Sequence, residues 1–579
     1  MKSLKELISE LNLHYLLVML AILSCKETKT DVPTEGGKGQ ATVYFGGDII
    51  TMMGDQPQYV EALVERNGKI EFVGDSDKAM ELAGMGHNML NLEGKTLIPG
   101  IIDGHAHFMG FGAQAIGANL LAYPDGKADN IPAVIEELKK FASGPDKERV
   151  GWIYGMGYDD SVLEEKRHPT KDDLDQVSTE FPVMAIHISG HFAAVNSKGL
   201  EVMGYDENSE DPEGGIIRRY EGTTQPNGVL EELAAIPFMI KVLTPSTVEN
   251  REYFIDKAQE LALKFGYTTA QEGRAFSDSH QALKDYSAKG KLKLDVVSYI
   301  DYANKEIIAK NISSEYVDGY RMGGMKITLD GSPQGRTAWA TLPYLIPPDG
   351  QEMGYAGYPA IPNDSIVQGL YLEAMENGWQ VLTHTNGDAA IDQMIRTMGP
   401  VVRKFPDLDH RNVMIHGQFT RQDQLDSIAK LNIFPSFFAM HTYYWGDWYD
   451  QIIGEERAQR ISPTRSALDR GMILTSHTDA PVALPNPINA MHITVNRTSR
   501  SGKIMGGNER LTPYEALKAI TIWGAYQHFE EGTKGTLEEG KLADLVILDN
   551  NPLKVNSKDI RDIRVMETIK AGKSVYKAN

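Results

Sequence analysis

Two histidines near residue 105 are spaced so that together they could hold a metal ion. His105 and His107 lie two positions apart in LIPGIIDGHAHF. On a β-strand this spacing points both imidazoles to the same face, where they could ligate one divalent ion. An HxH pair alone is common by chance, and two hydrogen-bonded surface histidines are its ordinary interpretation. The pair therefore predicts a metal site only together with further ligands.

Four more candidates occupy corresponding places farther along the chain. Lys326 lies in GMKITLDGS, His384 in VLTHTNGDAAID, His416 in VMIHGQ and Asp479 in LTSHTDAPV. Each follows a short apolar run and precedes a turn that contains Gly or Asp. These are the places where a barrel strand ends and a loop begins, which is where catalytic residues gather in an α/β barrel. Six such residues in this order are hard to obtain by chance.

Three further residues could contact a substrate. His191, in SGHFAAVNS, could reach over the site, although a structural histidine is equally common. Arg336 and Trp339 follow Lys326 on a loop that would cap the site. Arginine suits a carboxylate or carbonyl group, and tryptophan suits an apolar substituent. As residues of a surface loop, the last two could equally have no such role.

The remaining polar and aromatic candidates would support the site from outside. Asp330 and Asp388 follow ligand-bearing strands and could orient ligands. His477 lies two positions before Asp479, so it faces the same way and could line the site or be structural. The aromatic segment 437–450 follows the seventh strand. It could form an apolar wall at the barrel mouth, with buried packing as the ordinary alternative.

The elements around these residues predict an α/β fold with a (β/α)₈ barrel. Helical periodicity separates the strand-like runs, for example in VENREYFIDKAQELALKF. An extra segment at about 110–250 is too long for a plain connection and must have structure of its own. The predicted barrel strands are GIIDGHAH, TTAQEG, LDVVSYI, GMKITLD, QVLTHT, NVMIHG, IFPSFF and MILTSHTD.

Both ends of the chain carry short strand patterns that predict one shared sheet. Asn67-Gly68 marks a hairpin near the start and Ala571-Gly572 a turn near the end. Neither end has enough strands for a stable sheet, so pairing them into one small β-sandwich is expected. The predicted boundaries are 1–40 for a signal and polar linker, 41–97 and 531–579 for the sandwich, and 98–530 for the barrel domain.

Charge and cysteine usage limit the partners. The formal net charge of −21 disfavours nucleic acid, because an acidic surface repels phosphate. The single cysteine, Cys25, excludes a disulfide framework and a cysteine-based zinc site. It closes the apolar run LHYLLVMLAILS, which is too short for a comfortable membrane span and suits an export signal. A buried N-terminal helix is the alternative interpretation.

The region around Cys25 resembles a bacterial lipoprotein signal, which is cleaved before a cysteine that becomes acylated. The resemblance implies an exported protein anchored by lipid at Cys25, in the periplasm or at the cell surface. The cleavage box is loose, and Glu6 and Glu10 depart from a positively charged leader. The oligomeric state is left open, with a homo-oligomer among the alternatives.

The ligand order HxH, Lys, His, His, Asp, flanked by PGIIDGHAH and GKLADLVILD, resembles the amidohydrolase superfamily. The segments MKITLDGSPQGRTAW, HTNGDAAID and SHTDAPV resemble its YtcJ-type branch, which includes N-substituted formamide deformylases. The resemblance covers about residue 42 to the C-terminus. It implies a distorted TIM (β/α)₈ barrel with a composite β-sandwich built from both termini.

The resemblance also implies a role for each residue. His105, His107 and Asp479 would hold one metal and His384 and His416 a second, with zinc the first choice of ion. Lys326 would bridge the two as a carbamate formed with carbon dioxide. Asp479 would accept a proton from the metal-activated hydroxide and pass it to the leaving nitrogen.

The implied function is hydrolysis of an amide-type C–N bond in a small molecule, such as an N-substituted formamide or other carboxamide. The same residues could act on a cyclic amide or imide, an ester or a dipeptide-like bond. A third alternative is a non-catalytic surface lipoprotein, which would have no need for Lys326 and Asp479.

Overall fold

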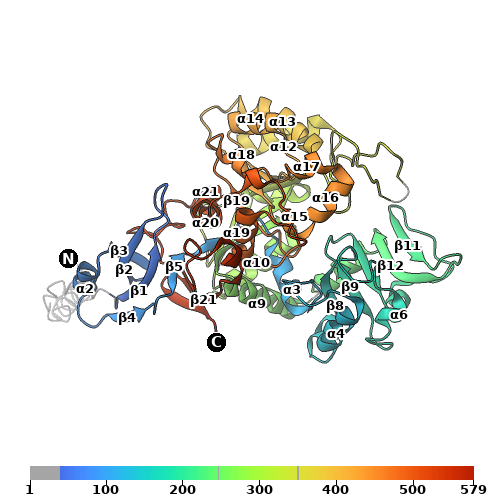
Figure 1. The fold of residues 1–579 in the computed structure, drawn as a ribbon, viewed down its shortest axis with the longest axis horizontal. Coiled ribbons are helices and arrows are strands. Elements are labelled where there is room, and N and C mark those ends of the chain that lie inside the picture. Colours follow the sequence, from blue (N-terminus) through green and yellow to red (C-terminus); the bar gives the residue numbers. More distant parts are fainter. Residues whose placement is uncertain (1–38, 246, 349–350) are drawn as a thin grey trace, which may run out of the picture.

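The computed structural model describes residues 39–245, 247–348 and 351–579. The predicted export signal and the lipidation at Cys25 lie outside these residues. Figure 1 shows three bodies: a sheet from the two chain ends, a central barrel-like body with its helices, and the inserted segment on the opposite side. Among the described residues, none of the helices has the length and apolar character needed to cross a membrane.

The central body is a curled, fully parallel sheet of eight strands, as in a TIM-barrel-like α/β fold. Each of the eight predicted runs overlaps one of its strands, so the prediction of these strands is confirmed. Within the described residues, no ladder joins the first strand to the last. The strands are β6 (Ile101–Ile102), β13 (Tyr267–Ala275), β14 (Asp295–Asp301), β15 (Tyr320–Thr328), β16 (Gln380–Thr385), β17 (Val413–His416), β18 (Phe434–Phe437) and β19 (Thr475–Ser476).

Helices alternate with these strands and cover the sheet. Helix α9 begins where the Thr247 side chain accepts the backbone N–H of Asn250, and it buries Ile255, Ala258 and Ala262 on one face. The same buried cluster contains residues of the strands and of most other covering helices. The helices around the barrel are α3 (Phe108–Ile116), α9 (Val248–Lys264), α10 (Ser277–Ser287), α11 (Ile308–Asn311), α12 (Asp364–Glu376), α13 (Asp388–Val402), α14 (Gln422–Lys430), α18 (Thr464–Leu468), α19 (Pro487–Asn496), α20 (Pro513–Lys518) and α21 (Ile522–Gln527).

Strands from the two chain ends form one eight-stranded sheet. Its order is β22-β21-β20-β5-β1-β2-β3, with β4 paired to β1. The turn at Asn67-Gly68 has positive φ at both residues, as does the turn at Ala571-Gly572. A two-layer sandwich stays a prediction. The elements are β1 (Thr42–Ile50), β2 (Tyr59–Arg66), β3 (Lys69–Gly74), α2 (Ser76–Ala83), β4 (Asn88–Asn91), β5 (Thr96–Pro99), β20 (Leu545–Leu548), β21 (Val565–Lys570) and β22 (Lys573–Lys577).

The inserted segment forms a third sheet, of mixed direction, with the order β11-β12-β10-β9-β8-β7. Two buried clusters pack on its faces. The domain boundaries drawn from the sequence stay predictions. The elements are β7 (Ala118–Asn119), α4 (Ile131–Ala142), α5 (Asp146–Val150), β8 (Ile153–Tyr158), α6 (Lys171–Leu174), β9 (Val183–His187), β10 (Phe192–Val195), α7 (Ser197–Met203), β11 (Gly215–Arg219), β12 (Pro226–Glu232) and α8 (Ile236–Leu243).

Candidate active site

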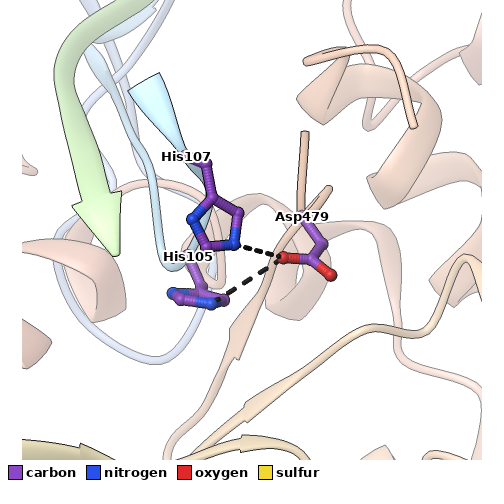
Figure 2. Close-up of side chains that lie close together, drawn as sticks. All are labelled: His105, His107 and Asp479. Carbon is purple, nitrogen blue, oxygen red and sulfur yellow. Dashed lines mark ion pairs between the residues drawn. The ribbon is translucent and has the colours of Figure 1, made fainter. Parts of the chain in front are cut away.

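The predicted ligands from the first, fourth and last strands converge on one point. His105 and His107 follow β6, Lys326 lies in β15 and Asp479 follows β19. Lys326 Nζ lies 3.0 Å from His105 Nε2. Figure 2 shows both imidazoles turned toward the Asp479 carboxylate, with Nε2 of His105 at 3.7 Å and Nε2 of His107 at 3.5 Å from its Oδ1.

The other two predicted ligands lie next to each other beside Asp479. The rings of His384, in β16, and His416, at the end of β17, have centroids 4.6 Å apart. His416 Nε2 lies 3.9 Å from Asp479 Oδ2. One carboxylate oxygen therefore faces His105 and His107, and the other faces His416. All six predicted metal-site residues meet at the carboxyl ends of the barrel strands.

The backbone is strained at two of these residues. His416 has φ of 74° and Asp479 has φ of 51°, in the left-handed region that non-glycine residues rarely adopt. Such a conformation costs about 1–3 kcal/mol and persists where the surroundings fix it. The backbone N–H of Asp479 donates to His105 O at 3.2 Å, which ties the ends of β6 and β19 together. This strain is of the kind that clusters at functional sites.

Burial controls the protonation of the site. It lowers the pKa of His105 and His416 well below the ordinary value, so both imidazoles are neutral. Burial likewise lowers the pKa of Lys326 to about 7, although Asp479 opposes the shift. Burial acts to raise the pKa of Asp479, but His107 and other neighbours lower it overall, so the carboxylate is ionised.

The donor atoms of the site fit a divalent metal ion. Ligand atoms of His105, His107 and Asp479 all lie within 4.8 Å of one another. Within the described residues, Asp479 Oδ1 is buried without a hydrogen-bond partner, which is costly for a polar atom. Neutral imidazoles and an ionised carboxylate are the ligands that zinc and similar ions take without thiolates.

Side chains behind the ligands hold them in place, and the sequence did not single out two of them. Gln271 Oε1 lies 2.6 Å from His105 Nδ1. Glu272 accepts the backbone N–H of Met109 at 2.8 Å, and its Oε1 lies 4.0 Å from His107 Nδ1. Both residues lie near the end of the predicted run TTAQEG, and this place could have marked them as candidates for the site.

Three residues were predicted to support the ligands, and two of them, Asp330 and His477, contact a predicted ligand, whereas Asp388 does not. Asp330 Oδ1 lies 3.2 Å from His384 Nδ1, and its carboxylate accepts the backbone N–H groups of the turn that follows this histidine. Asp388 instead accepts from Thr341 N at 2.8 Å, away from the ligands. His477 is buried, and its Nε2 lies 3.1 Å from His416 Nδ1, so it contacts a predicted ligand directly.

The predicted substrate residues lie on the loops above the strands. His191 Nδ1 lies 3.0 Å from Glu232 Oε1, and its Nε2 lies 3.4 Å from Ser332 Oγ on the loop after β15. Arg336 donates to Pro347 O at 2.9 Å and lines a cavity of about 550 Å³. Trp339 packs, half-buried, against the barrel core.

The cavity lies between the inserted segment and the loops that follow β15 and β18. It is lined on one side by residues of the insertion, including His168 and Phe192, and on the other by Gln334, Trp445 and Trp448. The aromatic segment contains α15 (His441–Tyr444) and α16 (Gly446–Ile453), and most of it is buried core. The cavity is therefore a partly open space between two parts of the protein.

A second group of possible ligands lies in the insertion, but its histidine is held in a tautomer that does not suit a metal ion. His187 Nδ1 accepts the backbone N–H of Ser189 at 3.1 Å, so the ring proton is on Nε2. Nε2 faces Asp160 Oδ1 at 3.0 Å and Asp159 Oδ1 at 3.9 Å. This is the arrangement of a histidine that donates to carboxylates, and a metal would need the opposite tautomer.

Comparisons with known proteins agree with this geometry. A model of the amidohydrolase family matches residues 88–576. The YtcJ protein of Bacillus subtilis (strain 168) is 25% identical over 554 residues, 92% of this chain and 99% of YtcJ. The N-substituted formamide deformylase of Arthrobacter pascens is 25% identical over 529 residues, 88% of this chain and 93% of that enzyme. The structure of an uncharacterized metal-dependent hydrolase from Pyrococcus furiosus matches with a TM-score of 0.69 and 25% identity, covering 89% of this chain and all of that one (100%).

Proposed function

This chain belongs to the amidohydrolase family and is a hydrolase that acts on carbon–nitrogen bonds, and we propose that it cleaves an N-substituted formamide or another small carboxamide. The observation that carries the proposal is the place of Asp479, whose Oδ1 faces His105 and His107 and whose Oδ2 faces His416. A related enzyme is named for N-substituted formamides, which supports this choice of substrate class.

The proposed metal ligands divide into two sets around Asp479. His105, His107 and Asp479 would hold one divalent ion, and His384 and His416 would hold a second. Zinc suits this donor set, as do manganese, iron and nickel. When bound, such ions would lower the pKa of a water molecule and polarise a carbonyl oxygen.

Lys326 would join the site as a carbamate rather than as an amine. A free ammonium between cations would be repelled and offers no lone pair. Because its buried amine has a pKa of about 7, a large part of it is neutral at physiological pH and can react with carbon dioxide. The carbamate offers two oxygens in place of one nitrogen.

Asp479 would move the proton during hydrolysis. Its carboxylate is ionised in the folded protein, so it can accept the proton of an attacking water. The same group would then deliver this proton to the leaving nitrogen. The cavity between the insertion and the loops after β15 and β18 would take the nitrogen substituent of the substrate, with Trp445 and Trp448 as its apolar wall.

Substrate and metal can be tested together. N-substituted formamides should be hydrolysed faster than cyclic imides, esters and dipeptides, and a chelator should abolish the activity until divalent metal is restored. Asp479→Asn should keep its metal and lose about 10²–10⁴-fold in turnover, the usual contribution of acid–base catalysis. The exposed Asp407→Asn is the matched control. Near-normal turnover by metal-loaded Asp479→Asn would refute the proton-transfer role, and preference for another bond would refute the substrate class.

We also propose that the protein is exported and anchored by lipid at Cys25. The support is the apolar run that ends at this cysteine, with a polar linker after it. Mass spectrometry of the protein from membranes should find an acylated N-terminal cysteine, and Cys25→Ser should release the protein. An unmodified N-terminus upstream of Cys25 would contradict the proposal.

A further inference from the structure

One backbone carbonyl beneath the site fixes the direction of a long chain of hydrogen bonds. The oxygen of Gly104 accepts from Gln271 Nε2 at 3.0 Å and from Gln527 Nε2 at 2.6 Å. Because a carbonyl oxygen cannot donate, both glutamines must turn their NH₂ groups toward it. Their Oε1 atoms therefore point away from Gly104, and each begins a separate branch.

The first branch is short and ends at a predicted metal ligand. Gln271 Oε1 lies 2.6 Å from His105 Nδ1. An amide oxygen only accepts, so the ring proton of His105 must be on Nδ1. Its Nε2 then carries a bare lone pair, which faces Lys326 Nζ at 3.0 Å and Asp479 Oδ1 at 3.7 Å.

The second branch passes through two hydroxyl groups. Gln527 Oε1 accepts the hydroxyl proton of Thr475 at 2.7 Å. Thr475 Oγ1 and Ser436 Oγ lie 2.8 Å apart, and because the one hydroxyl proton of Thr475 is already used at Gln527, Ser436 must donate across this contact. The proton of Ser436 is thereby used as well, so Ser436 Oγ can only accept from His477 Nδ1, at 2.8 Å.

The same branch ends at the other predicted ligand group. With its proton on Nδ1, His477 presents a lone pair at Nε2. This atom lies 3.1 Å from His416 Nδ1, which must therefore donate. His416 Nε2 is left bare and faces Asp479 Oδ2 at 3.9 Å. Two branches from one carbonyl thus give His105 and His416 the same tautomer.

The scheme requires that each imidazole carries a single ring proton. His105, His416 and His477 are 0%, 3% and 1% exposed, and their rings are neighbours. Adjacent imidazolium ions in so dry a site would be costly, so each ring is neutral. We propose that Gln271 and Gln527 are positioning residues that, through the Gly104 carbonyl, hold His105 and His416 as Nδ1–H tautomers with Nε2 free to bind metal.

Gln527 is the less obvious of the two residues, because it lies outside the barrel strands. It ends helix α21 and reaches His416 through Thr475, Ser436 and His477. A hydrogen bond to the second ring nitrogen of a histidine ligand fixes the tautomer and the ring orientation. The inference rests on the proposed function only where it names Nε2 as a metal ligand, because the tautomers belong to the metal-free chain.

The tautomers can be measured without metal. The full chain, labelled with ¹⁵N-histidine and stripped of metal, should give long-range ¹H–¹⁵N spectra typical of Nδ1–H for all three imidazoles. Single His→Gln variants assign the signals. An Nε2–H pattern at His416 or His477 in the wild-type protein would overturn the proposed branch.

A matched pair of variants tests the branch through Thr475. In Thr475→Val, Ser436 loses its acceptor and can donate to His477 Nδ1, which moves the protons of His477 and His416 toward Nε2. His105 should keep its tautomer, and the affinity for Zn²⁺, measured by chelator competition, should fall about 10–100-fold. Thr475→Ser should restore both tautomers and affinity.

The outcomes separate this inference from the proposed function. Unchanged tautomers and Zn²⁺ affinity in Thr475→Val would overturn the inference, and a loss of thermal stability alone would mean a merely structural role. Wild-type tautomers as expected, in a chain that binds no metal, would uphold the hydrogen-bond scheme and refute the proposed function instead.

Discussion

Glu530 lies at the centre of a buried ion cluster that joins the base of the barrel to the sheet of the chain ends. Its Oε1 accepts from Arg321 Nη2 at 2.8 Å and from Tyr316 OH at 2.6 Å, and its Oε2 lies 2.8 Å from Lys534 Nζ. The side chains of Arg321 and Glu530 are 6% and 7% exposed. Lys534 also pairs with Asp295 at 2.5 Å. Replacing Glu530 by glutamine therefore removes one charge from a dry network.

The size of the effect follows from which charges lose their partner. Removing one member of a buried ion pair costs about 3–5 kcal/mol, because the other charge stays buried. In Glu530→Gln, Lys534 keeps Asp295 while Arg321 loses its carboxylate. Glutamine has nearly the same volume and can still accept from Tyr316. We therefore expect the free energy of unfolding to fall by about 3 kcal/mol, at the lower end of that range.

The same variant should change the pH dependence of stability. Burial acts to raise the pKa of Glu530, but Lys534, Arg321 and His528 lower it far below the ordinary value overall. A carboxyl with a lowered folded-state pKa contributes its full stability above its unfolded pKa of about 4.3, and loses it as the pH falls toward the folded value. The difference between wild type and Glu530→Gln should be constant from pH 6 to 8 and shrink below pH 4.

Urea unfolding followed by tryptophan fluorescence, at pH 7 and at pH 3, measures both effects. Glu201→Gln is the matched control, because it breaks the exposed 2.6 Å pair with Lys198 and should change stability by less than about 0.5 kcal/mol. A Glu530→Gln variant as stable as this control at pH 7 would refute the reasoning. A difference that grows as the pH falls would refute the assigned sign.

Two further substitutions test the site and the seam of the barrel, which is the junction between its first and last strands, β6 and β19. Lys326→Met should fold but lose most hydrolysis and part of its bound metal by elemental analysis; wild-type metal content and rate would contradict the carbamate. Gly104→Ala should lower the free energy of unfolding by about 1–3 kcal/mol through overpacking, because an added Cβ would lie 2.6 Å from the Thr475 side chain. The control is Gly532→Ala, where a Cβ meets nothing within 4 Å, and equal stability of the two variants would contradict the tight seam.

The convergence of the six predicted ligands could be expected from the sequence because each lies at or near the end of an apolar run. The alternation of strands and helices places all such ends at one mouth, so His384 and His416 could be grouped without knowing any distance. Gln271 lies near the end of its predicted run and was missed because an amide is a weaker sign of chemistry than an imidazole. A place near the end of a predicted strand therefore marked more residues of the site than the histidines, lysine and aspartate that were singled out.

Gln527 could not be predicted in this way. It belongs to a helix that follows the last barrel strand, and its contacts with Gly104 and Thr475 exist only when the curled sheet brings the first and last strands together. The aromatic segment shows a similar limit. Most of it is buried core, as Phe438 and Tyr449 show, while Trp445 and Trp448 line the cavity. Its role as a wall for a substrate stays a prediction, because periodicity cannot separate a cavity wall from core.

The site and the closure of the barrel depend on the same residues. Within the described residues, no ladder joins β6 to β19, and polar contacts replace it: Asp479 N donates to His105 O, and Gln527 links Gly104 to Thr475. His105 and Asp479 are therefore neighbours across the seam as well as proposed ligands of one ion. An ion bound by both would hold the two edges of the sheet together and stabilise the folded state by an amount that grows with the logarithm of its concentration above its Kd. The backbone strain at Asp479 and its unpartnered Oδ1 then have one explanation: a cation bound at this junction would interact with Oδ1 and offset the strain.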